Sequence, residues 1–204
     1  MKKTILVLSV MVFTLIVMTG CTAPWTTNTG RNSVEQQLLA IAIERGVDCA
    51  AFAKYAGKKF FIDYSNCAPQ VDKPYLQSSL EYALAKQKIV VAKAEKDADF
   101  ILEPGCGVLA TNYDKIFIGL PTIPAPIPST SISFVIPEIP FFSKYTRFGN
   151  ARMRFNLLKA KDRTPEYQVA PVNIETYYTN WSIFFIPFST TNMDIEPKAT
   201  PAKK

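Results

Sequence analysis

The sequence predicts one domain of the α/β (α+β) class: a single mixed sheet of about five strands with two main helices, plus a long proline-rich apolar loop. Three observations predict it. Strand-like, helical and strand-like segments follow one another between Lys58 and Ala92, which favours parallel pairing by a right-handed crossover. Two later segments alternate apolar and polar residues across a short turn, which favours antiparallel pairing. The 204 residues are 48% apolar and 20% charged, as in one globular domain with a buried core.

The N-terminus has the features of an export signal. Lys2 and Lys3 precede an uncharged apolar run from Thr4 to Met18, the basic and hydrophobic regions of a secretory signal. As a helix, this run would rise about 22 Å, less than the ~30 Å of a bilayer core. We therefore expect residues 1–20 to be a cleaved lipoprotein signal peptide and not a permanent span.

The residues from Met18 to Cys21 resemble the bacterial lipobox, in which a small residue precedes a cysteine that is linked to diacylglycerol. Several acyl chains on one cysteine attach a protein stably to a membrane. We expect lipidation at Cys21 and a polar tether over residues 21–31. In a Gram-negative cell, Thr22 rather than Asp after the cysteine implies sorting to the outer membrane, and we expect the protein there, facing the periplasm. The alternatives are a signal peptide that happens to contain a cysteine and an uncleaved anchor.

The domain itself is expected over residues 32–188. Its first helix begins at Asn32 or Ser33, either of which has a capping-box partner three residues on, and runs to about Ala53. A strand follows from Lys58 to Tyr64.

The second helix opens at Asp72-Lys73-Pro74, with proline in the first turn, where it is tolerated. Strands are predicted at 89–92 and 99–110, and the glycines of the latter predict a bulge or an edge position.

Two further strands are expected at 152–159 and 167–178, where apolar and polar side chains alternate. Lys161 to Thr164 forms the turn between them. From Ser189, prolines and terminal lysines predict a disordered tail over 189–204.

Cysteine usage leaves two interpretations open. With Cys21 lipidated, three thiols remain, an odd number for an oxidising compartment. They are either small buried hydrophobes or include a disulfide between Cys67 and Cys106. Counted from Phe60 and Asp99 in the two predicted strands, each of these cysteines lies seven residues further on, so they are level if the strands are parallel neighbours. Cys49 would then remain free.

Residues 116–142 hold 14 apolar residues and six prolines, with Glu138 as the only charge. Six prolines exclude a transmembrane helix. The segment is either a long loop folded over the sheet as part of the core, or an exposed apolar arm that docks onto a membrane, a second subunit or a partner. Residues 181–188 would extend the same surface. The predicted interaction residues are Ile123, Pro124, Ile127, Phe134, Ile136, Phe141, Phe142, Phe184 and Phe185.

The chain contains no histidine, which excludes histidine-based catalytic triads, histidine metal sites and histidine pH switches. Nucleophile elbows, phosphate loops and metal-ligand spacings are also absent from the sequence. We therefore expect no enzyme activity, no metal and no cofactor. A carboxylate-based glycan hydrolase is a remote alternative, because two carboxylates need no motif.

Seven basic residues and one acid lie between Lys144 and Arg163. They are either an ordinary solvated strand face or, at Arg147, Arg152 and Arg154, contacts to an anionic surface. Without the signal the net charge is only +4 and no recognition motif is present, so nucleic acid is not expected as a partner.

Several runs resemble a family of bacterial envelope lipoproteins to which no activity is assigned. These runs are residues 27–39, 57–63, 96–99, 119–124 and 177–181. The order of strand, helix and strand followed by Ala98-Asp99-Phe100-Ile101-Leu102 is similar, at the level of fold alone, to the curli secretion channel subunit and to the penicillin-binding-protein activators. The family resemblance implies the envelope lipoprotein class and adds no catalytic residue, and the fold-level resemblance implies assembly or partner regulation and not catalysis.

The sequence therefore predicts a non-enzymatic, lipid-anchored envelope protein that binds a protein partner or self-associates. The alternative is a carrier of a lipid or apolar ligand, held in a pocket beneath residues 116–142.

Overall fold

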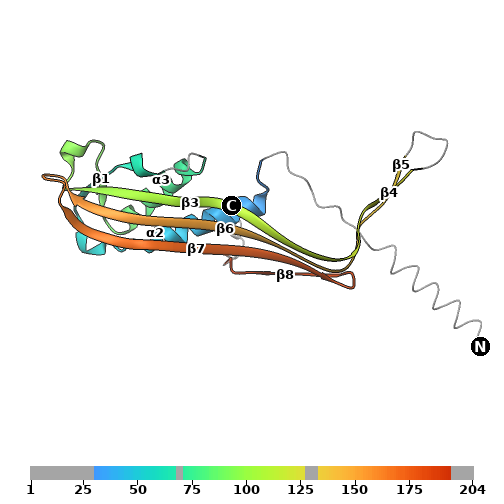
Figure 1. Ribbon diagram of the computed structural model, residues 1–204. Coiled ribbons are helices and arrows are strands. Elements are labelled where there is room, and N and C mark those ends of the chain that lie inside the picture. The colour runs from blue at the N-terminus through green and yellow to red at the C-terminus, as the bar shows by residue number, and fades with distance from the viewer. Residues whose placement is uncertain (1–29, 68–70, 127–132, 194–204) are drawn as a thin grey trace, which may run out of the picture.

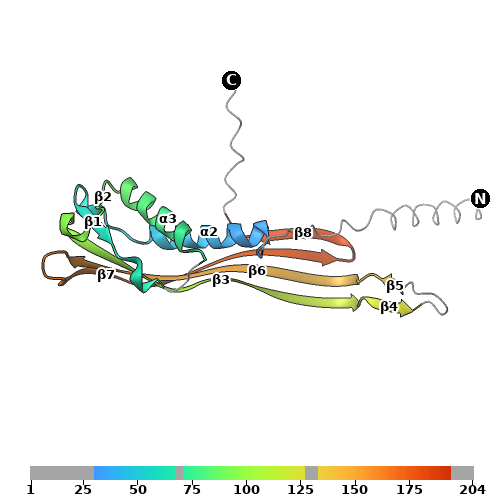
Figure 2. The same cartoon turned by 90° about the horizontal axis from the view of Figure 1, so that it is seen from above.

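The computed structural model describes residues 30–67, 71–126 and 133–193. A long, narrow sheet forms one layer, and two helices cover one face of it toward one end (Figures 1 and 2). The helices are α2 (Ser33–Asp48) and α3 (Lys73–Lys86). The strands are β1 (Lys59–Ile62), β2 (Val90–Val91), β3 (Phe100–Leu120), β4 (Ile123–Pro126), β5 (Ser133–Ile136), β6 (Ile139–Lys159), β7 (Pro165–Ile183) and β8 (Ile186–Thr191). Single 3₁₀ turns lie at Ala53–Tyr55, Tyr64–Asn66 and Glu95–Asp97.

The main sheet has six strands in the order β2-β1-β3-β6-β7-β8, and β4 and β5 form a separate two-stranded sheet. β1 pairs in parallel with β2 and with β3, whereas β3, β6, β7 and β8 pair antiparallel. The α+β class and the mixed sheet are confirmed, but about five strands was too few. The additional strand is β8, because the chain reverses within two residues after Ile183 and pairs back onto β7.

Residues 116–142 are not the loop that the sequence predicted. β3 and β6 remain paired as far as Leu120 and Ile139, and the described residues beyond them form the β4–β5 pair. Prolines are tolerated there because each strand of a two-stranded pair has a free edge. Pro124 and Pro126 are two residues apart, so their nitrogens, which carry no hydrogen, point to the same edge.

The bulge predicted by the glycines of β3 is present, because the β3–β6 register shifts between Cys106 and Val108. The predicted edge position is present too. β1 pairs with β3 only at Phe100–Leu102, and in the described part of the chain no strand pairs with the outer edge of β3 from Gly107 onward.

Helix α2 is fixed by its N-cap and by the strands beneath it. Asn32 and Glu35 form the predicted capping box, and the buried Thr176 hydroxyl donates to the Leu38 carbonyl at 2.7 Å. A Cβ atom at Gly149 would lie 2.5 Å from the Leu38 carbonyl carbon, so glycine permits this close approach. The helix ends at Asp48, five residues before the predicted end.

The hydrophobic core lies between the helices and the end of the sheet that they cover. Phe52 is fully buried and makes edge-on contacts with Phe60 and Phe155. Among the described residues, none from 110 to 150 belongs to this buried cluster. The prediction that residues 116–142 form part of the core is therefore wrong for the described residues of this segment.

The predicted disulfide joins Cys67 and Cys106, whose Cα atoms are 4.7 Å apart, and it links the chain after β1 to β3. Cys49 is free and exposed. The tail begins later than predicted, because Ser189 to Thr191 belong to β8. The Asn192 side chain accepts a hydrogen bond from the Tyr177 amide at 2.7 Å, and Met193 is buried. The predicted signal, the Cys21 lipidation site and residues 194–204 lie outside the described residues.

Candidate interaction surface

The sheet continues well beyond the helices that cover it. The N-terminal turn of α2 reaches β6 through Glu35, whose carboxylate lies 3.8 Å from Arg147 Nε. Past this point the sheet has no helix above it (Figure 2). We call this part, made of residues 114–120, 139–146 and 179–191, the distal sheet.

Large apolar side chains are exposed on the distal sheet. They come from β3, from β6 and from the hairpin that β7 and β8 form, so they cover the whole width of the distal sheet. These residues are Ile116, Ile118, Leu120, Phe141, Ile183, Phe184, Phe185, Ile186 and Phe188. A gathering of exposed large apolar side chains in one part of a protein is typical of an interaction site.

A row of aromatic rings crosses three strands of the distal sheet. The Trp181 indole stacks on Phe188 with ring centroids 5.9 Å apart, and Phe142 meets it edge-on at 6.1 Å. The indole N–H donates to Thr190 Oγ1 at 3.2 Å, and Lys144 Nζ lies 5.0 Å from the centre of the indole. Cross-strand contacts therefore hold these rings in fixed positions.

A two-residue turn joins β7 to β8 at the end of the distal sheet. Ile183 and Ile186 form the last pair, and both central residues, Phe184 and Phe185, have positive φ, at 43° and 67°. Their side chains are 72% and 63% exposed. The Phe184 amide donates to the Phe141 carbonyl at 2.9 Å, so the turn also contacts β6.

The structure brings together only part of the predicted interaction set. Phe141 and Phe142 are next to the turn that carries Phe184 and Phe185. The others belong to a separate place: Ile123 pairs with Ile136 in the β4–β5 sheet, where Pro124 and Phe134 also lie, and Ile127 is outside the described residues.

The predicted interaction residues did not name Ile118, Trp181, Ile186 or Phe188, although these four lie within the predicted segments 116–142 and 181–188. One signal was available in the alternation of Ile116, Ile118 and Leu120, which continues the pattern of β3. The stacking of Trp181 on Phe188 was not visible, because it depends on the pairing of β7 with β8.

The three predicted arginines do not form one site. Arg147 lies on the helix-covered face, near Glu35 and over the Tyr145 ring at 4.4 Å. Arg152 and Arg154 are exposed on the opposite face, because the buried Met153 between them points toward α2. The alternation of β6 therefore separates Arg147 from the other two.

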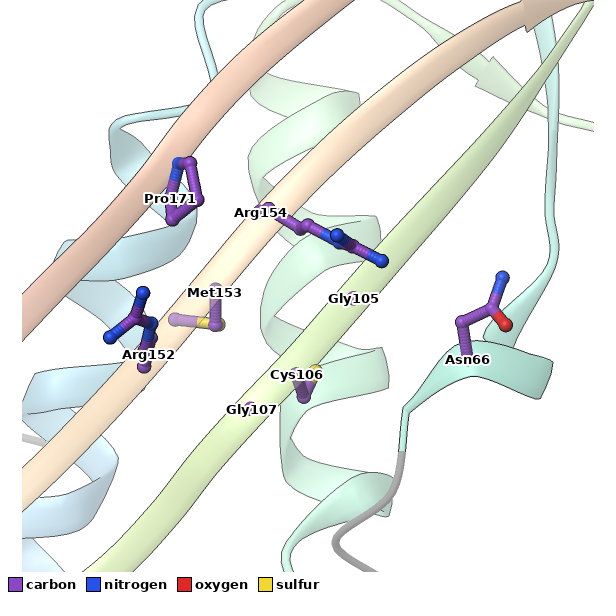
Figure 3. A pocket seen from close by; sticks show the side chains of 8 residues that line it. All are labelled: Asn66, Gly105, Cys106, Gly107, Arg152, Met153, Arg154 and Pro171. Carbon is purple, nitrogen blue, oxygen red and sulfur yellow. The ribbon is translucent and has the colours of Figure 1, made fainter.

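Arg152 and Arg154 line a hollow of about 220 Å³ together with Asn66, Gly105, Gly107 and Pro171 (Figure 3). The Arg154 side chain crosses β3 directly above Gly105, where a Cβ atom would come within 2.7 Å of Nε. In the described part of the chain, no acid lies within ion-pairing distance of either guanidinium.

A second hollow, of about 1070 Å³, is lined by α2 and by the residues that open α3, including Leu39, Ile43, Val71 and Tyr75. None of the described residues between 116 and 142 lines it. It is therefore not the ligand pocket that the sequence analysis considered beneath that segment.

Asp63 and Tyr64, two adjacent residues whose pKa values are shifted, lie at the helix-covered end. The Ser65 backbone amide donates to Asp63 at 3.0 Å and lowers the pKa of that carboxyl. Burial raises the pKa of the neighbouring Tyr64 phenol. In the described residues there is no group of three or more acidic or cysteine side chains placed to hold a metal ion.

The described helices include none that is long and apolar enough to cross a membrane. Together, the fold and the exposed surface define an α+β protein built on a long sheet that projects past its helices. The chain belongs to the family of unknown function DUF6655, whose model matches residues 15–193. No curated protein matches the chain.

Proposed function

We propose that this protein is a non-enzymatic, lipid-anchored component of the bacterial cell envelope that binds a protein partner or a second copy of itself. Lipid on Cys21 would attach it to the outer membrane on the periplasmic side. The contact surface is the projecting arm, which we define as residues 116–126 and 133–142.

The carrying observation is that the arm contributes nothing to the core and yet is rich in exposed apolar residues. Ile116, Ile118, Leu120 and Ile123 are each more than two-fifths exposed. Water disfavours such exposure, and the fold gains nothing from it. A surface that another molecule covers accounts for both facts.

The free edge of β3 supports the same function. From Gly107 to Leu120 the outer edge has no partner strand in the described chain, so its N–H and C=O groups are available to another strand. Exposed edges are a recurrent means by which proteins add a strand from a partner.

Replacing residues 121–138 with Asn-Gly tests whether the arm is the contact surface. Because Leu120 pairs with Ile139, a two-residue turn can close the shortened hairpin without moving either strand. A photo-crosslinking residue is placed at Ile118, which both versions contain, and a control crosslinker at Tyr82 on α3, which is 73% exposed. In intact cells we expect discrete adducts from Ile118 that are lost in the shortened version, and none from Tyr82.

Mixing two differently tagged copies in the same cells distinguishes self-association from a separate partner. Equal adducts from Ile118 and Tyr82, or adducts from Ile118 that persist when the arm is shortened, would contradict the proposed surface. The lipid anchor is tested independently by labelling cells with radioactive palmitate. We expect the label in the intact chain and not in Cys21→Ser.

A further inference from the structure

The Phe184–Phe185 turn has a sequence that its own backbone disfavours. A two-residue hairpin turn with positive φ at both central positions is normally occupied by Asn-Gly or a similar pair. Side chains with a Cβ atom are strained at positive φ, and bulky ones more than Asn. Local stability therefore does not explain why phenylalanine occupies both positions.

Solvation does not explain it either. Phe184 and Phe185 are 72% and 63% exposed, and the flanking Ile183 and Ile186 are also exposed. Four consecutive large apolar residues thus face water at the tip of a hairpin. Since backbone strain and solvation both disfavour this sequence, the reason for it lies in something that the turn contacts outside the chain.

The surroundings of the turn match the interface of a lipid bilayer. No charged residue occurs from Thr176 to Met193, so the whole hairpin can approach acyl chains without removing a charge from water. Behind the tip lie the Trp181 indole and Lys144, residue types that favour the headgroup region. We infer that the turn formed by residues 183–186 inserts into the interfacial region of a membrane.

The hairpin can enter this region because its backbone is largely paired. Ile183 and Ile186 form a strand pair, and the Phe184 amide donates to the Phe141 carbonyl. Unpaired backbone groups strongly oppose entry into hydrocarbon. A short apolar tip inserts about 5–10 Å, to the boundary between headgroups and acyl chains, where water still reaches the remaining carbonyls.

The turn is also on the side of the molecule where the chain from the lipid anchor enters the fold. This argument rests on the proposed lipidation of Cys21. Gly30 is nine positions after Cys21, so the two Cα atoms lie at most about 30 Å apart. Helix α2 begins at its end nearer the β7–β8 turn (Figure 2). The β4–β5 pair bends away from the β8 edge (Figure 1), so the arm remains free for a protein partner while the turn contacts lipid.

The test uses the chain from residue 21, which contains the entire described fold. Cys21→Ser prevents attachment of lipid, and Trp25→Phe leaves Trp181 as the only tryptophan. We call this the reference chain. Vesicles contain three parts phosphatidylethanolamine and one part phosphatidylglycerol, with or without bromine on the acyl chains. We expect a blue shift of Trp181 emission on binding, and quenching by the brominated lipid.

Three variants distinguish insertion of apolar side chains from a need for aromatic rings and from non-specific binding. F184N/F185G should reduce the partition coefficient at least about tenfold, while its Tm rises by a few degrees because the turn strain is relieved. F184L/F185L should retain binding, since lipid requires apolar side chains and not aromatic rings. Tyr82→Asn, at an exposed aromatic on α3, should bind like the reference chain.

Absence of vesicle binding, or binding by F184N/F185G equal to that of the reference, would overturn the inference. A third result would also overturn it: the reference chain does not bind vesicles, and the F184N/F185G substitution removes the protein adducts seen in cells. The turn would then contact a protein and not lipid. Since the tested chain carries no lipid and the assay contains no partner, these outcomes are independent of whether Cys21 is acylated or the arm binds protein.

Discussion

Removal of the Cys67–Cys106 disulfide should cost this protein a large part of its stability. The bond closes a loop across a sequence separation of 39 residues. In the chain-entropy description, breaking a loop of this length frees the unfolded state by about 4 kcal/mol. Total stabilities of domains are only about 5–15 kcal/mol, so the loss is substantial.

The double variant C67A/C106A isolates this effect. Both sulfurs are in the core, at 1% and 5% exposure, and alanine leaves no unpaired polar group there. Urea unfolding, followed by circular dichroism, should show the midpoint falling by about 2 M, given a slope near 2 kcal/mol per molar for a chain of this size. Cys49→Ala is the control, because Cys49 is exposed and unbonded.

Reductant provides a second, independent measurement. Dithiothreitol should lower the midpoint of the intact protein by a similar amount and leave C67A/C106A unchanged. If reductant has no effect on the intact protein, or if C67A/C106A unfolds at the same urea concentration as Cys49→Ala, the argument from loop closure does not hold.

Three other outcomes follow from the described contacts. Replacing 121–138 with Asn-Gly should change the free energy of unfolding by no more than about 0.5 kcal/mol, because no described residue of the replaced segment is in the core; a larger loss in urea would contradict this placement. Gly149→Ala should destabilise by about 2–4 kcal/mol, since its Cβ would meet the Leu38 backbone at 2.5 Å, whereas Gly107→Ala, with a nearest contact of 3.7 Å, should be nearly neutral; equal melting temperatures would be inconsistent with the close approach. The lowered pKa of Asp63 means that its carboxylate stabilises the fold above the unfolded-state pKa near 4, and that this contribution disappears as pH falls through the lower folded value. Asp63→Ala should therefore be less stable than the native chain at pH 7 and converge with it at acidic pH, as thermal melts across pH 2–7 would show.

The covered end of the fold was largely predictable from the sequence because its signals are local. The capping residues of α2 and the alternation around Met153 each identify an element without knowledge of the rest. The Cys67–Cys106 pairing was available as one of two interpretations because both cysteines lie near neighbouring parallel strands.

The sequence left two interpretations of the projecting end, a loop in the core or an exposed arm, because prolines and a long apolar run are compatible with both. Which interpretation applies depends on the continued pairing of β3 with β6 out to Leu120 and Ile139, a long-range property. Likewise, the positive φ values of Phe184 and Phe185 arise from the two-residue connection between β7 and β8. Phenylalanine itself gives no signal for such a turn.

Several features that oppose folding preferences lie together at the projecting end of the molecule, while the covered end carries two single positive-φ residues, Lys88 and Arg163. At the covered end, caps, glycine contacts and buried side chains all favour the same structure, as expected of a sequence selected for folding. At the other end there are a strand edge that no described strand pairs with, exposed apolar side chains and two strained phenylalanines. In natural proteins such departures occur mainly where function requires them. The proximity of all three to each other, and their distance from the core, is therefore the main physical argument that the distal sheet and the arm are the functional part of this protein.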